Sequence, residues 1–123
     1  MKGYPLNKEI TVNRNRRGST YSKEELEEQT RAKNDIVDVI CSITDRDELI
    51  AMFDDILTPT EIDDIIQRWL LMEDIYKGIP QRDIASKRKM SLCKITRGSK
   101  MLKKEDGFMH RLLSSRYDDH LHI

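Results

Sequence analysis

A central stretch, which opens with LTPTE and continues as a long amphipathic run, constrains the fold more than any other part of the chain. Thr58 and Glu61 have the spacing of a capping box, in which each side chain accepts a hydrogen bond from the backbone N–H of the other. Pro59 suits the first position of a helix, where the N–H that proline lacks would be unpaired. Apolar residues recur at helical spacing up to Tyr76, and Gly78 can adopt the left-handed conformation that ends a helix. The sequence therefore predicts a helix from Thr58 to just before Gly78.

Similar start signals predict helices on either side of this segment. Ser22 and Glu25 form another capping box ahead of a long helix, and Asp45 with Glu48 repeats the signal ahead of a shorter one. After the central helix, the pattern predicts two short helices with a brief break and then a short closing helix. No segment alternates in the manner of a strand. We therefore predict an all-α fold of about five to six helices.

The two short helices occupy about residues 80–103 and have the arrangement of a helix-turn-helix unit. Ile84 and Ala85 belong to the first helix, and Ser91 can cap the second. Three apolar residues of the second helix are expected to point toward the core: Leu92, Ile95 and Leu102. The second helix of such a unit enters the major groove of DNA with its N-terminal residues facing base edges.

At 123 residues, the chain is most economically a single domain. We predict a helical domain over residues 22–114, a flexible basic arm over residues 1–21 and a frayed tail over residues 115–123. No apolar run is long enough to cross a bilayer, and the N-terminus lacks the apolar region of a signal peptide. We therefore expect a cytoplasmic protein with no membrane partner.

The residues that carry catalytic or metal chemistry are scattered. All histidines lie within the last fourteen residues, and the chain contains no nucleophile motif and no glycine-rich phosphate loop. Cys41 and Cys93 lack the spacing of a metal site or of a disulfide framework. We therefore expect no enzymatic activity and no metal.

The formal net charge is zero, but the charges are unevenly distributed along the chain. Residues 45–64 contain eight carboxylates and one cation, whereas residues 82–104 contain nine cations and one carboxylate. Basic groups on a helix-turn-helix unit are typical of DNA binding, because lysine and arginine neutralise backbone phosphates. The pattern favours double-stranded DNA as the partner. The alternative is a basic helical hairpin whose charges serve only solubility.

The same region resembles the bacterial Trp repressor family. The resemblance rests on LTPTE at 57–61, Arg68 ten residues after Thr58, the Gln81-Arg82 pair and KITRGSKMLK at 94–103. In that family LTP.E begins the central helix, a QR pair begins the first helix of the helix-turn-helix unit, and ITRGS..LK ends the recognition helix. The resemblance covers about residues 35–103. It implies an intertwined all-helical homodimer, a transcriptional repressor that binds operator DNA when L-tryptophan is bound as corepressor.

The resemblance also implies a ligand site. Arg68 and Arg97 match two arginines that enclose the indole ring, and Arg97 also meets the carboxylate; guanidinium groups suit both tasks. Leu57 and Thr58 match positions whose backbone carbonyls, from the partner chain, receive the ammonium group. Gly98 matches a glycine that leaves room for the ring.

A second set of residues falls at positions that face bases or phosphates. These residues are Gln81, Arg82, Ala85, Ser91, Leu92, Cys93, Lys94, Thr96, Lys100 and Lys103. Cys93 takes the place of a small apolar residue, and we expect it to contact a thymine methyl group rather than to take part in redox chemistry.

The sequence departs from the family at the ligand site and in the turn. Met101 lies at the ligand position where a small hydroxyl residue is usual, and Lys94 replaces a small residue early on the recognition helix. Arg88-Lys89 replaces a Leu-Gly pair, so Lys89 must adopt a costly left-handed conformation or force a different turn. Met90 can supply the lost apolar contact if the turn shifts.

Three functions are therefore compatible with the sequence. The first is a repressor that depends on L-tryptophan or a similar amino acid. The second is a DNA-binding relative that has lost the ligand. The third is a helical protein-interaction module that does not bind DNA.

Overall fold

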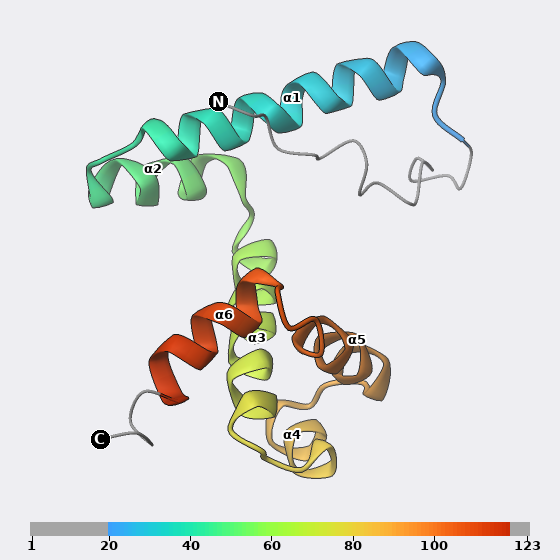
Figure 1. Ribbon diagram of the computed structural model, residues 1–123. Coiled ribbons are helices and arrows are strands. Elements are labelled where there is room, and N and C mark those ends of the chain that lie inside the picture. The colour runs from blue at the N-terminus through green and yellow to red at the C-terminus, as the bar shows by residue number, and fades with distance from the viewer. Residues whose placement is uncertain (1–19, 119–123) are drawn as a thin grey trace. The chain divides into compact units, whose positions relative to one another are not determined.

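The structure is a computed structural model that describes residues 20–118. These residues form six α-helices and one π-helical segment and contain no β-strand, so the prediction of an all-α chain is confirmed (Figure 1). The chain divides into two compact units, Met1–Asp55 and Ile56–Ile123. In chain order the elements are α1 (Lys23–Ser42), α2 (Arg46–Ile56), α3 (Pro59–Tyr76), α4 (Gln81–Arg88), α5 (Leu92–Leu102), α6 (Phe108–Leu113) and η1 (Ser114–Asp118).

The first unit contains α1 and nearly all of α2. The predicted capping box is present at the start of α1, where the backbone N–H of Glu25 donates to Ser22 Oγ at 3.1 Å and that of Ser22 donates to Glu25 Oε1 at 3.0 Å. The hydrogen bond from the Ser22 backbone lowers the pKa of the Glu25 carboxyl. At the start of α2, Asp45 Oδ1 accepts from the backbone N–H of Asp47 at 3.1 Å. The start signal there is a single cap by Asp45.

Neither helix of the first unit has a buried residue. Four of the large apolar side chains on these two helices are 40–47% exposed, namely Ile36, Val39, Ile50 and Phe53. Helices of this length are stabilised in proteins mainly by burial of their apolar face. The described part of the first unit therefore lacks a core of its own.

The second unit is organised around α3, whose two ends match the prediction. At its start, the backbone N–H of Thr58 donates to Glu61 Oε1 at 2.8 Å, and that of Glu61 donates to Thr58 Oγ1 at 3.2 Å. At its end, Gly78 has φ 85°, and the N–H groups of Gly78 and Ile79 each donate to α3 carbonyls at 3.0 Å. This pattern is the Schellman motif, in which glycine avoids the steric cost of the left-handed conformation.

Helices α4 and α5 are joined by a tight turn and lie beside α3 (Figure 1). Each of the three helices contributes one fully buried side chain to a common cluster: Leu71, Ile84 and Ile95. Leu92 was expected to join this core, but it is 63% exposed. Ile95, Gly98 and Leu102 define the buried stripe of α5. With about 100° per residue, Leu92 lies at the margin of that stripe, one turn beyond the cluster.

The C-terminal segment packs against α3 through a second cluster, formed by Met72, Leu102 and Leu113. Helix α6 continues as the π-helix η1, within the stretch for which a frayed tail was predicted from residue 115 onward. The Tyr76 hydroxyl donates to Asp118 Oδ2 at 2.6 Å, and the Tyr117 hydroxyl donates to Glu73 Oε2 at 3.1 Å. The bond to Asp118 raises the pKa of Tyr76. These contacts order the chain as far as Asp118; the rest of the predicted tail, and residues 1–19 of the predicted arm, lie outside the described residues.

Candidate nucleic-acid interface and ligand cleft

The turn between α4 and α5 is built around Lys89. This residue has φ 51° and ψ 48°, so it takes the left-handed conformation, the first of the two alternatives that the sequence left open. The backbone N–H of Met90 donates to the Ala85 carbonyl at 3.2 Å, and Ser91 Oγ accepts from the backbone N–H of Lys94 at 3.3 Å. Met90 packs against the buried cluster that holds the three helices together. The turn thus keeps both its hydrogen bonds and its apolar contact without a glycine.

Arg88 and Asp74 form an ion pair that sequence reasoning did not anticipate. Arg88 Nε lies 2.6 Å from Asp74 Oδ2, and the two side chains are 13% and 7% exposed. Asp74 lies three residues after Leu71, on the side of α3 that faces α4 and α5. An acidic residue on the buried side of an amphipathic helix is the signal that could have revealed the pair, because a buried carboxylate needs a partner.

Most of the residues predicted to face DNA are exposed on α4 and α5. Nine of the ten are exposed, namely Gln81, Arg82, Ser91, Leu92, Cys93, Lys94, Thr96, Lys100 and Lys103. Ala85 is half-buried and packs against the Leu71–Ile84–Ile95 cluster, so its side chain serves the core at least in part. The exposed set extends from the start of α4 to the residue that follows α5.

The basic residues of this surface are almost all free of acidic partners. Of the nine cations between residues 82 and 104, only Arg88 forms an ion pair within the described part of the chain. Among the described residues, most of the positive charge of α4 and α5 is therefore not ion-paired, and phosphate groups of a nucleic acid would be favourable partners for it.

A cleft of about 710 Å³ lies between α3, the turn and α5. Its lining includes four of the six predicted ligand residues, Arg68, Arg97, Gly98 and Met101. Leu57 and Thr58 do not line it within this chain; they precede α3, and the Thr58 carbonyl accepts the first helical hydrogen bond of α3, from Ile62, at 3.0 Å. The prediction placed these two carbonyls in the partner chain, and it remains a prediction.

Gly98 is buried where α5 crosses α3. A Cβ atom at this position would lie 3.1 Å from Leu71 Cδ2 and 3.4 Å from Ile75 Cδ1. Such a contact with Leu71 is tighter than ordinary van der Waals packing. The glycine therefore allows the close approach of the two helices, in addition to lining the cleft. The prediction assigned it only to making room for a ligand.

Comparison with known protein families identifies the family of this chain. A model of the family described as Trp repressor protein matches residues 31–116, from α1 to η1. The chain belongs to the Trp repressor family. Members of this family are DNA-binding transcriptional regulators and not enzymes. No curated protein and no solved structure was found to match the chain.

Two of the departures from the family pattern lie in the cleft. Lys94 and Met101 both line it, one turn to either side of Arg97 and Gly98 on the same side of α5. Met101 is half-buried and packs against the Met72–Leu102–Leu113 cluster, so its side chain fills space next to the core. The family usually has a small hydroxyl residue at this position, and a hydroxyl group could hydrogen-bond the ligand. The Met101 side chain has no such group.

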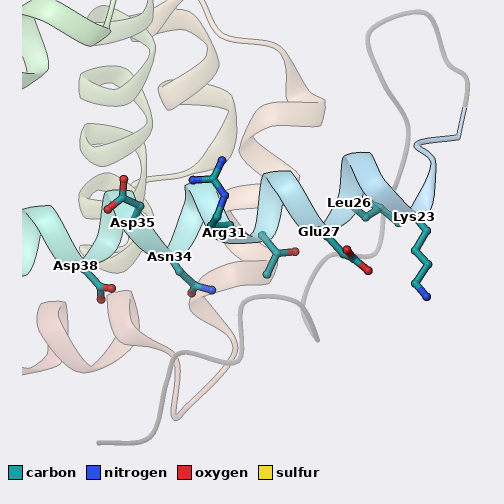
Figure 2. A pocket seen from close by; sticks show the side chains of 8 residues that line it. Lys23, Leu26, Glu27, Arg31, Asn34, Asp35 and Asp38 are labelled. Atoms are coloured by element: carbon teal, nitrogen blue, oxygen red, sulfur yellow. The ribbon is translucent and has the colours of Figure 1, made fainter.

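A second hollow lies on the surface of α1 (Figure 2). All eight side chains that line it belong to this one helix, and Lys23, Glu27, Arg31 and Asp35 alternate in charge at four-residue spacing. Such an alternation is typical of a solvated helix face supported by weak ion pairs. In the described part of the chain, no cluster of histidine, cysteine and acidic side chains is arranged to hold a metal, and no helix is both long and apolar enough to span a bilayer.

Proposed function

We propose that this protein is a cytoplasmic, homodimeric repressor of the Trp repressor family that binds specific DNA sequences through α4 and α5. The observation that carries the proposal is the basic surface of a helix-turn-helix unit in a chain of this family, where of nine cations only Arg88 is ion-paired within residues 20–118. Helix α5 enters the major groove, where Cys93, Lys94 and Thr96 meet base edges. Arg82, Lys100 and Lys103 contact phosphates.

The dimer is supported by the apolar surface of the first unit. Its helices have no buried residue, and several large apolar side chains on α1, α2 and α3 are more than a third exposed. A second copy of the chain would cover such surface and complete a core that one chain lacks. Each copy would then present one α5, and the two recognition helices would lie about 34 Å apart to reach successive major grooves.

Selection of bound duplexes from a random pool tests the proposal. We expect the enriched sequence to have two-fold symmetry, with half-sites one helical turn apart, because the symmetry of the dimer is imposed on its operator. Arg82→Ala should weaken binding to all sequences about equally, as loss of a phosphate contact does. If the bound pool shows no enriched sequence, sequence-specific regulation is excluded.

The cleft is the proposed effector site. A carboxylate-bearing ligand, for which the family indicates L-tryptophan or a similar amino acid, would lie between Arg68 on α3 and Arg97 on α5. By joining the two helices it would favour the position of α5 that fits DNA, so ligand and DNA would each strengthen the binding of the other. Arg97→Ala should abolish the effect of any such ligand on DNA binding; an unchanged effect would place the ligand elsewhere.

A second candidate is a regulator that binds DNA without a ligand. Lys94 and Met101 favour it, because neither residue offers the small, neutral surroundings that the family pocket usually provides near its ligand. Calorimetry with L-tryptophan at millimolar concentration tests the tryptophan-dependent form of the first candidate, since the second candidate predicts no heat of binding.

A further inference from the structure

The cleft between α3 and α5 contains more positive charge than a neutral amino acid can neutralise. Arg68, Lys94 and Arg97 line it and form no ion pair within the described part of the chain. Arg88 also lines it, but its charge is already matched by Asp74 at 2.6 Å. Three cationic side chains from two helices therefore share one concave space without a partner.

The position of Lys94 makes it part of this site. It lies in the first turn of α5, and Arg97 and Met101 follow three and seven residues later on the same side of the helix. An anionic group between Lys94 and the start of α5 would also lie at the positive end of the helix dipole. The lysine thus adds a second anion-binding position, one turn from Arg97, at the place where the family usually has a small residue.

The acidic residues of the cleft do not cancel this charge. Asp63 and Asp64 line it from α3, against Arg68, Lys94, Arg97 and the lysine of the turn. With Arg88 neutralised by its own partner, an excess of two positive charges remains in the lining. A neutral amino acid brings one carboxylate and one ammonium group and leaves that excess unchanged.

We infer that the cleft selects a small organic ligand with two anionic groups and a net negative charge, one group held by Arg68 and Arg97 and the other by Lys94. The ligand is a dicarboxylate or a phosphorylated amino acid, and L-tryptophan is disfavoured. The inference rests on the proposed effector role of the cleft and sharpens it, because it assigns the choice of ligand to Lys94 and Met101. Met101 supplies an apolar wall where the hydroxyl that would bond an ammonium group is missing.

Calorimetry on the full chain tests the inference with ligand pairs that differ in one anionic group. L-Glutamate is compared with L-glutamine, O-phospho-L-serine with L-serine, and L-tryptophan is titrated separately. One charge-assisted hydrogen bond corresponds to about tenfold in affinity or more. We expect at least one acidic compound to bind about tenfold more tightly than its neutral partner; the pair that shows the difference identifies the carboxylate or the phosphate as the second group. If neither pair differs, or if L-tryptophan binds most tightly, the inference is wrong.

Lys94→Gln and Lys104→Gln provide matched variants. Both remove one exposed lysine charge, but Lys104 follows α5 and does not line the cleft. Lys94→Gln should remove the preference for the acidic compound, and Lys104→Gln should retain it; circular dichroism checks that both variants are folded. Equal retention of the preference in both variants would overturn the inference.

Duplex binding without added ligand, measured on the same proteins, separates two kinds of failure. If the native chain binds no duplex, the proposed function fails whatever the calorimetry shows. If Lys94→Gln weakens duplex binding but leaves the preference among the ligands intact, Lys94 serves DNA and the assignment of ligand class to it is wrong.

Discussion

The Asp74–Arg88 pair offers the sharpest test of how the helix-turn-helix unit of α4 and α5 is held on α3. The two side chains are only 7% and 13% exposed, so solvent screens the pair weakly, and among residues 20–118 no second partner of the Asp74 carboxylate is seen. Replacing Arg88 by Met leaves this carboxylate charged and buried. Breaking a buried pair in this way costs about 3–5 kcal/mol. At about 4–8 °C per kcal/mol for a domain of 60–100 residues, the midpoint of thermal unfolding should fall by more than about 10 °C.

The double variant Asp74→Leu/Arg88→Met separates the penalty of an unpaired charge from the worth of the pair. Replacing a buried ion pair by apolar side chains is often neutral or stabilising. The double variant should therefore unfold within about 1 kcal/mol of the native chain, or be more stable. Urea unfolding at one fixed protein concentration measures all variants, because the stability of a dimer depends on concentration. Lys87→Met, an exposed substitution on α4, is the control. If Arg88→Met lowers the free energy of unfolding by less than about 1 kcal/mol, the reasoning is refuted, because burial of a carboxylate without a partner should cost more than that.

Three further predictions concern the turn, the helix crossing and the first cap. Lys89→Gly should raise the free energy of unfolding by about 0.5–1 kcal/mol in urea, because relief of the left-handed conformation exceeds the extra entropy of glycine in the unfolded chain; Lys89→Ala should bring no gain. Gly98→Val should lower the free energy of unfolding by about 1–3 kcal/mol, because the added side chain would contact Leu71. Unchanged stability would contradict the close crossing of α3 and α5. The folded-state pKa of Glu25 is lowered, so its contribution to stability is present above about pH 4 and is lost as the pH falls through the folded pKa. Glu25→Gln should therefore lower stability at neutral pH, and the difference from the native chain should shrink as the pH falls through the folded pKa, as followed by circular dichroism.

The elements of the fold could be predicted where the signal is local. Thr58 with Glu61, and Gly78 at the other end of α3, mark the bounds of that helix because caps and left-handed glycines act within a few residues of themselves. The same holds for Ser22 and Glu25 at the start of α1. The helix-turn-helix pair also follows from short-range spacing, whereas the resemblance to the family rests on the motifs at 57–61 and 94–103 together.

What could not be predicted depends on tertiary contacts. The exposure of Leu92 depends on where the core of α3, α4 and α5 ends, and helical spacing alone does not show it. Asp74 is buried because Arg88 reaches it from another helix, fourteen residues away. The order of Tyr117 depends on Glu73, 44 residues earlier in the chain. Helix propensity and hydrophobic periodicity carry no information on such distant partners.

The residues of the candidate site could be predicted better than the role of each residue. Arg68, Arg97, Gly98 and Met101 were expected at one ligand site, and the structure brings them around one cleft. The second role of Gly98, in the helix crossing, required the distance to Leu71. Lys94 was assigned to DNA and was also noted as a departure from the family, and the structure places it in the lining of the cleft.

The dependence of DNA binding on salt tests the central claim most directly. Fluorescence anisotropy with a labelled duplex, at a series of salt concentrations, gives the slope of log K against log salt. If α4 and α5 contact phosphates, binding should be strong at low salt and fall steeply. Lys100→Gln should reduce the slope by about two units, one for each copy in the proposed dimer, while Lys33→Gln on α1 leaves it unchanged. Absence of binding at low salt as well as at high salt, or binding that does not respond to salt, would contradict the assignment of α4 and α5 as the DNA-binding surface.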